Sequence, residues 1–141
     1  KTTQTEKKIT ETQTLSVWET QEKFAEALKT VKSKILIESP WIKRATLKYI
    51  NDIENALKKD VKVIILYGIE SNDDHHYGAI KKLQKLNVEY QKNFHLIHLP
   101  THFEEKRNYK MTGTHRKLII KDNDYYIQGS FNFLSFNLTI F

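Results

Sequence analysis

The sequence contains no cysteine, and it has only 2 prolines and 4 glycines among its 141 residues. Without cysteine the chain cannot form a disulfide framework, a cysteine-based zinc site or a thiol nucleophile. Its apolar runs are far shorter than the roughly 20 residues that a membrane-spanning helix needs. No apolar stretch follows the amino terminus as it would in a signal peptide. We therefore expect no membrane partner and a cytoplasmic location.

The length and composition fit one globular domain. A chain of 141 residues with 39% hydrophobic and 11% aromatic side chains can bury a core of its own. Residues 1–14 are rich in Thr, Gln, Lys and Glu, so we interpret them as a linker or flexible arm and residues 15–141 as the domain. The sequence begins at Lys1 without an initiator methionine. We therefore expect a fragment of a larger protein, whose other domains would be partners.

The charge balance is basic. Lysine and arginine total 23 against 17 acidic residues, which gives a formal net charge of +6. Such a balance favours a polyanionic partner, either nucleic acid or an anionic membrane surface. Most of the basic residues are lysines scattered along the expected helices, where lysines commonly form a solvated face. Charge by itself therefore leaves nucleic-acid binding open.

Apolar residues follow helical and strand patterns in turn along the chain. Apolar positions at helical spacing begin after Ser16, which forms the pattern of a capping box with Glu19 three residues later. Short apolar runs indicate buried strands, of which the first ends at Pro40 and the second at Gly68. A helix precedes each of the first three strands. The expected strands are residues 35–37, 61–67, 95–99, 115–121 and 125–128.

Strands that alternate with helices favour an α/β fold, in which right-handed crossovers join parallel strands of one sheet. We therefore expect an α/β sandwich with a mixed, mostly parallel sheet and helices on both faces. Residues 101–114 are interpreted as a polar loop. Beyond this loop, a tight turn at residues 122–124 joins the last two strands into an antiparallel hairpin.

Four polar side chains are expected to meet at the ends of this hairpin. His115 and Lys117 lie two residues apart, which places them on one face of a strand, and Ser130 and Asn132 repeat that spacing after the returning strand. An imidazole can act as a nucleophile near neutral pH, and an ammonium, a hydroxyl and a carboxamide can bind phosphoryl oxygens. Gly129 permits a close approach to the backbone. The set fits an anionic phosphodiester.

Asp122 stands at the turn, and we interpret it as a structural carboxylate that accepts hydrogen bonds from turn amides or orients a neighbour. The pattern HxKx4D that begins at His115, followed by GSxN from Gly129 to Asn132, resembles the HKD signature of the phospholipase D superfamily. It is similar in particular to single-HKD, nuclease-like bacterial domains that accompany helicase-type DNA-processing proteins. The resemblance covers about residues 15–141.

This resemblance implies a phospholipase D-like sandwich and cleavage of a phosphodiester, DNA or RNA, through a covalent phosphohistidine. It implies that His115 is the nucleophile, that Lys117, Ser130 and Asn132 bind phosphate, and that Asp122 completes the catalytic set. Members of the family build one active site from two HKD motifs. A chain with one motif therefore implies a homodimer, in which the partner's His115 is the general acid. No metal and no cofactor are implied, because the paired lysines supply the positive charge.

Four further residues are candidate substrate contacts. Lys106, Arg107 and Lys110 lie in the loop before the catalytic strand and can contact a nucleic-acid backbone, although two glutamates in the same loop oppose this. Trp41 ends a buried strand, where it either stacks on a base or packs as a core aromatic. Two alternatives to a nuclease stay open. One is a non-catalytic nucleic-acid-binding dimerisation module, and the less favoured one is a phospholipase, which would need an apolar interfacial surface.

Overall fold

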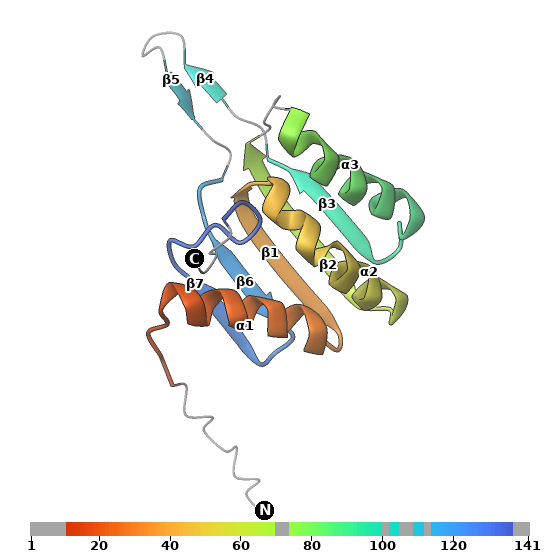
Figure 1. The fold of residues 1–141 in the computed structure, drawn as a ribbon, viewed down its shortest axis with the longest axis vertical. Helices are drawn as coiled ribbons and strands as arrows, with labels where there is room; N and C mark the ends of the chain where they lie inside the picture. Colours follow the sequence, from red (N-terminus) through yellow and green to blue (C-terminus); the bar gives the residue numbers. More distant parts are fainter. Residues whose placement is uncertain (1–10, 70–73, 100–101, 105–108, 112–113, 137–141) are drawn as a thin grey trace, which may run out of the picture.

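The computed structural model describes residues 11–69, 74–99, 102–104, 109–111 and 114–136. Its elements are, in order, α1 (Val17–Thr30), β1 (Lys34–Trp41), the 3-10 helix η1 (Arg44–Tyr49), α2 (Ile50–Lys58), β2 (Lys62–Ile69), α3 (Asp74–Glu89), β3 (Phe94–His98), β4 (His102–Glu104), β5 (Tyr109–Met111), β6 (Leu118–Lys121) and β7 (Tyr125–Gln128). The helices lie against one sheet, and the β4–β5 hairpin extends away from it (Figure 1). None of the helices within the described ranges is long and apolar enough to cross a membrane.

Helix α1 starts where the capping pattern predicts. The Ser16 hydroxyl accepts a hydrogen bond from the Glu19 amide at 3.2 Å, and the Glu19 carboxylate accepts one from the Ser16 amide at 3.0 Å. These bonds satisfy amide donors that the start of a helix leaves unpaired. The helix ends at Thr30 because Val31 adopts extended backbone, and Phe24 on its inner face is fully buried.

The main sheet has five strands in the order β3-β2-β1-β6-β7. Strands β1, β2 and β3 are parallel, β6 runs antiparallel to β1, and β7 runs antiparallel to β6. The prediction of a mixed sheet with a C-terminal antiparallel hairpin is therefore confirmed, and two of the four strand pairings in this sheet are parallel. Strand β6 lies inside the sheet, and β7 forms one edge of it.

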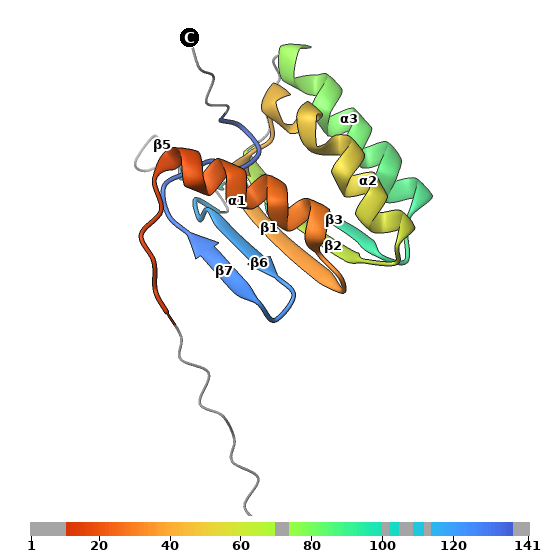
Figure 2. The ribbon, with the colours of Figure 1, turned by 60° about the horizontal axis from the view of Figure 1, so that its bottom comes forward.

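The three α-helices that the structure describes all cover the same face of this sheet (Figure 2). Within the described part of the chain, the prediction of helices on both faces is therefore wrong. Strands β1, β2 and β3 follow one another across the sheet in a single direction. Because the crossover connections between parallel strands are right-handed, α2 and α3 both lie on the same side of the sheet. Helix α1 packs beside α2. Ile37 and Ile65 on the helical face are fully buried, whereas Leu36 and Ile64 on the other face are partly exposed.

Two strands continue through the residues predicted to end them. Pro40 lies within β1 but beyond Glu38, the last residue that pairs with β6, so its missing amide removes no bond of that ladder. Gly68 lies within β2, at a point where another segment crosses the strand. The predicted polar loop at residues 101–114 contains β4 paired antiparallel with β5. Each of these two strands has 3 residues, too few to show a strand periodicity.

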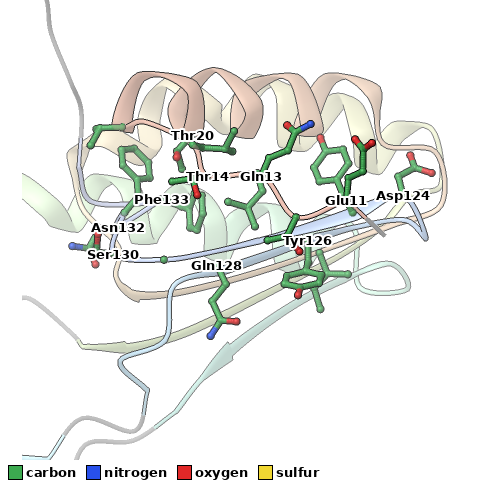
Figure 3. A pocket seen from close by; sticks show the side chains of 18 of the residues that line it. Glu11, Gln13, Thr14, Thr20, Asp124, Tyr126, Gln128, Ser130, Asn132 and Phe133 are labelled. Carbon is green, nitrogen blue, oxygen red and sulfur yellow. The ribbon is translucent and has the colours of Figure 1, made fainter. Parts of the chain in front are cut away.

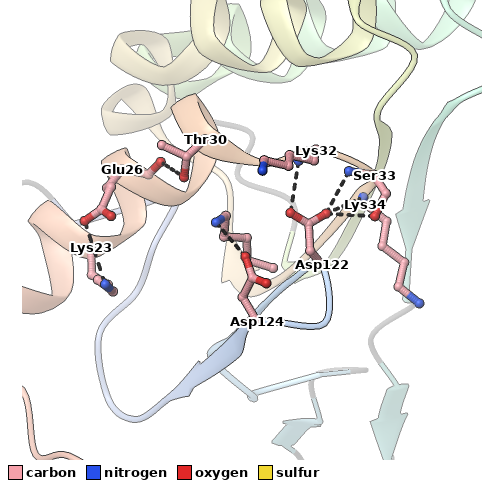
Figure 4. Close-up of polar contacts among 9 residues, drawn as sticks. Lys23, Glu26, Thr30, Lys32, Ser33, Lys34, Asp122 and Asp124 are labelled. Atoms are coloured by element: carbon pink, nitrogen blue, oxygen red, sulfur yellow. Dashed lines mark hydrogen bonds and ion pairs between the residues drawn. The ribbon is translucent and has the colours of Figure 1, made fainter.

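The Asp122 carboxylate connects the β6–β7 turn to the start of β1 through hydrogen bonds (Figure 4). Its carboxylate accepts hydrogen bonds from the amides of Lys32, Ser33 and Lys34 at 3.0, 2.7 and 3.0 Å. The Ser33 hydroxyl donates a further bond at 2.9 Å. Asp122 itself has a positive φ of 49°, which Asp tolerates better than most residues do. One side chain thus joins segments 90 residues apart in the sequence.

We expect Asp122 to make the stability depend on pH. Partial burial raises its pKa, but the hydrogen bonds from Lys34, Lys32 and Ser33 outweigh burial and hold the pKa well below its usual range. Such a carboxylate stabilises the fold above its unfolded pKa of about 4, and this contribution is lost as the pH falls. Asp122→Asn should lower the free energy of unfolding at pH 7 by about 2 kcal/mol and flatten its decline below about pH 4.

Urea unfolding at a series of pH values measures both effects. The matched control is Asp124→Asn in the same turn, whose carboxylate instead contacts the Lys121 ammonium at 2.9 Å and is largely exposed. This control should keep the acid-dependent decline of the wild type. An Asp122→Asn chain that declines as steeply as the wild type would show that Asp122 is not the responsible group.

Candidate active site

The two halves of the sequence motif lie side by side. His115 and Lys117 come immediately before β6, which starts at Leu118 and not at His115 as predicted, and Ser130 comes just after β7. The Gly129 amide donates a hydrogen bond to the Lys117 carbonyl at 3.3 Å, which joins the two segments. Since β6 is antiparallel to β1, both segments lie at the carboxyl end of the parallel strands. This is the edge where α/β sheets bind ligands.

His115 and Lys117 differ in their exposure. His115 is exposed, whereas only 9% of the surface of Lys117 is accessible. The Lys117 ammonium donates a hydrogen bond to the His115 carbonyl at 2.9 Å. An ammonium has three donors, so this bond leaves it capacity to bind an anion as well. The His115 imidazole is therefore accessible to solvent, and the positive charge of Lys117 lies next to the backbone of His115.

Asn132 lies between Phe131 and Phe133 in the sequence, and both of these aromatic side chains are buried. The rings of Phe131 and Phe133 pack edge to face with centroids 5.4 Å apart, and the Phe133 ring lies 5.2 Å from that of Phe24 in α1. The side-chain oxygen of Asn132 is buried and has no hydrogen-bond partner among the described residues. The carboxamide therefore keeps bonding capacity for another group. Ser130, two residues earlier, is exposed.

The segment that leads into His115 crosses β2 at Gly68. A Cβ atom at Gly68 would lie 3.0 Å from both the amide nitrogen and the carbonyl oxygen of Thr114, so only glycine lets the two backbones approach this closely. Thr114 is buried, and its hydroxyl donates a hydrogen bond of 2.7 Å to the carboxylate of Glu38 in β1. The sequence patterns assigned no role at the site to Glu38 or Thr114, and they indicated Gly68 only as the end of a strand. The available signal was a glutamate directly after the apolar run at residues 35–37.

Trp41 lies at the end of β1, near the chain that follows Asn132. Its side chain is half-buried, and the Lys43 ammonium lies 4.7 Å from the centre of its ring. The Lys43 amide and the Thr46 hydroxyl both donate hydrogen bonds to the Leu134 carbonyl, at 2.9 and 2.7 Å. These bonds tie the loop after β1 to the segment after the GSxN motif. Trp41 is therefore at the rim of the candidate site.

Not all of the other predicted residues are found at this edge of the sheet. Lys106 and Arg107 are outside the described residues, and Lys110 belongs to β5. Asp122 lies at the opposite end of β6 from the motif histidine, and its carboxylate is engaged by the turn before β1, which matches a structural role. A Cβ atom at Gly129 would meet no described atom within 4 Å. The backbone of Gly129 approaches that of Lys117 through their hydrogen bond, but packing within the described residues leaves room for a side chain at Gly129.

A groove of about 1150 Å³ runs along the edge strand β7. Ser130 and Asn132 lie at one end of it, and Glu11 and Asp124 lie at the other (Figure 3). The His–Lys half of the motif does not line this groove. His115 and Lys117 therefore lie outside the groove, at the carboxyl end of the parallel strands. The groove extends from Ser130 and Asn132 along β7.

The fold resembles known structures. NucT from Helicobacter pylori matches with a TM-score of 0.62 and 18% sequence identity, over 83% of this chain and 69% of that chain. TrmBL2, an archaeal chromatin protein whose structure shows a novel mode of DNA binding, matches with a TM-score of 0.49 and 15% identity, over 77% of this chain and 36% of that one. No family model and no curated protein matches the sequence. The likeness to NucT shows a shared α/β fold.

Gly68→Ala tests the crossing of the two backbones. The added methyl group would lie 3.0 Å from backbone atoms of Thr114. These backbone atoms cannot rotate away from the methyl group as the end of a flexible side chain can. We expect a loss of about 1–3 kcal/mol in the free energy of unfolding, as for other overpacked sites. The matched control is Gly78→Ala in α3, where a Cβ atom would meet no described atom within 4 Å. This control should be neutral or stabilising by up to about 1 kcal/mol.

Thermal and urea unfolding of both variants supply the comparison, and backbone chemical shifts show whether Thr114 moves. If Gly68→Ala is as stable as Gly78→Ala and leaves the Thr114 signals in place, the close crossing is not present in solution.

Proposed function

We propose that residues 15–141 form a phosphodiesterase domain, specifically a nuclease that cleaves DNA or RNA through a covalent phosphohistidine. The observation that carries the proposal is the hydrogen bond from Gly129 to Lys117, which joins both motif halves at the carboxyl edge of the sheet. It supports the roles implied by the resemblance to the phospholipase D superfamily. The α/β fold shared with NucT supports the fold that this resemblance implies.

The proposed reaction has two steps. In the first, an imidazole nitrogen of His115 attacks the phosphorus, the bond to the leaving oxygen breaks, and this oxygen takes a proton from a second imidazole. In the second, water attacks the phosphorus, gives a proton to the second imidazole and releases His115, which leaves a phosphate monoester. The Lys117 ammonium, the Ser130 hydroxyl and the Asn132 carboxamide stabilise the negative charge on the non-bridging oxygens.

A single His115 cannot serve on both sides of the phosphorus at once. In-line displacement places the nucleophile and the leaving oxygen opposite each other. We therefore propose that the partner's His115 is the second imidazole, brought across the substrate by a two-fold axis. The exposure of His115 and Ser130 supports this arrangement, because a shared site needs its motif residues at the surface.

Charge and the rim of the site support nucleic acid as the substrate. The net charge of +6 favours a polyanion. At the rim, the Lys43 ammonium lies beside the half-buried Trp41 ring. A cation next to an aromatic ring suits a phosphate and its neighbouring base. These features favour a nucleic-acid strand over a phospholipid.

A substrate panel with a chelator tests the proposed activity. Labelled single-stranded DNA, duplex DNA, RNA and phospholipid vesicles are incubated with the chain in EDTA. We expect cleavage of nucleic acid that survives EDTA, because Lys117 and its dimer mate supply the charge of a cation. His115→Ala should abolish cleavage and leave the melting temperature unchanged, since the side chain is exposed. Lys117→Ala should lower the rate about 10²- to 10³-fold.

The control for His115→Ala is His95→Asn, on β3 at the opposite edge of the sheet from β7. It should cleave at the wild-type rate. Binding of nucleic acid without any cleavage would identify a binding module, and hydrolysis of phospholipid alone would identify a phospholipase. Activity that EDTA removes and magnesium restores would place the chemistry at a different site.

Mixed dimers test the shared site. Wild-type chains are refolded together with an equal amount of His115→Ala chains, so that the subunits assort at random. If both imidazoles of a dimer are needed, only the pure wild-type dimers cleave, and about one quarter of the activity of an all-wild-type sample remains. Mixing with His95→Asn should leave the activity undiminished. A residual activity of about one half would mean that each chain cleaves independently.

A further inference from the structure

Glu38 is a charged residue buried inside the sheet. It follows the apolar residues 35–37 of β1, and only 8% of its surface is accessible. It pairs in register with Leu118 of β6 and lies on the face away from the helices, where the segment that crosses at Gly68 covers it. A buried carboxylate is costly, and pairing it adds little net stability. Stability alone therefore favours an apolar residue at this position.

The carboxylate of Glu38 contacts the residues on both sides of His115. One carboxylate oxygen accepts a hydrogen bond of 2.7 Å from the Thr114 hydroxyl. The other lies 3.9 Å from a guanidinium nitrogen of Arg116, whose side chain is 61% exposed. The contact with Thr114 is the stronger of the two, because it is a buried hydrogen bond to a charged acceptor. The contact with Arg116 is weaker, because solvent screens it.

The Thr114 hydroxyl also closes a turn around His115. Its oxygen accepts a hydrogen bond from the Arg116 amide at 3.2 Å. The hydroxyl group therefore acts as a donor to Glu38 and as an acceptor for the Arg116 amide at the same time. A hydrogen bond that a threonine hydroxyl oxygen accepts from the amide two residues later defines a recognised turn, and the middle residue of this turn is His115. Glu38 thus decides which way the hydroxyl that closes this turn is oriented.

We infer that Glu38 is a positioning residue of the site: through Thr114 and Arg116 it holds the backbone of His115 in the orientation that aims the imidazole at phosphorus. The inference rests on the proposed function, in which His115 is the nucleophile. A misplacement of about 1 Å can cost about 10²-fold in rate. Loosening the turn should therefore lower kcat more than it raises KM.

Four variants separate positioning from simple stability. Thr114→Val keeps the shape of the side chain but removes both hydrogen bonds, and Thr114→Ser keeps the hydroxyl. Glu38→Gln keeps an acceptor for the hydroxyl but removes the negative charge. The matched control is Glu54→Gln in α2, which removes a partly exposed carboxylate that pairs with Lys58 at 3.3 Å. The readouts are kcat and KM on a single-stranded oligonucleotide, hydrogen exchange at the Arg116 amide, and the melting temperature.

We expect Thr114→Val to lower kcat about 10- to 100-fold with a KM within about twofold of wild type, and to speed exchange at the Arg116 amide about tenfold. Thr114→Ser should restore both values to within about twofold of wild type. Glu38→Gln should fall between the two, because a neutral acceptor binds the hydroxyl more weakly. Glu54→Gln should match the wild type in kcat and in exchange.

Two results would overturn the inference. One is a Thr114→Val chain, folded at the assay temperature, whose Arg116 exchange and kcat equal those of the wild type. The other is an equal loss of kcat in Thr114→Val and Thr114→Ser, which would show that the hydroxyl is not the responsible group. If the wild-type chain cleaves no substrate, the proposed function fails. The exchange at Arg116 then decides by itself whether Glu38 and Thr114 order the turn around His115.

Discussion

Strand β6 is held against β1 at both of its ends, and the geometry of the candidate site depends on these two attachments. At one end, Asp122 accepts its hydrogen bonds from the turn before β1. At the other end, the Thr114 hydroxyl donates to Glu38. Strand β6 has only 4 residues, so its ladder supplies few bonds of its own. A slip of one residue would move Lys117 to the other face of the sheet, and the two attachments oppose such a slip.

The side chains that would touch a substrate in the proposed site range from exposed to buried, whereas those that support them are all buried. His115 and Ser130 are exposed and Lys117 is buried. The supporting residues Thr114, Glu38 and Phe133 are buried as well. Glu38 belongs to strand β1, Thr114 donates a hydrogen bond to Glu38, and Phe133 packs against helix α1. The proposed reactive groups would therefore need little rearrangement to bind a phosphodiester. This is the arrangement that preorganised sites require. His115 and Lys117 do not line the groove along β7. The proposed reaction is therefore assigned to the carboxyl end of the parallel strands and not to this groove.

Features that depend on neighbours in the sequence are predicted well, and those that depend on distant packing are not. The capping box at Ser16 and the turn at residues 122–124 follow from local patterns and are confirmed. The helices on one face and the β4–β5 hairpin are missed. Which face a helix covers depends on the direction in which the chain steps through the sheet. Strands of three residues carry too little periodicity to be recognised.

The sequence by itself determined the chemical groups of the candidate site and their spacing. The intervals between His115 and Lys117, and between Ser130 and Asn132, can be recognised because side chains alternate along extended backbone. Only the tertiary structure decided that His115 stands in a turn whose closing hydroxyl, that of Thr114, donates a hydrogen bond to Glu38. Its partner Thr114 is 76 residues away in the sequence. A contact of this kind is created when β1 and β2 pack beneath the crossing segment, and no local periodicity can encode it.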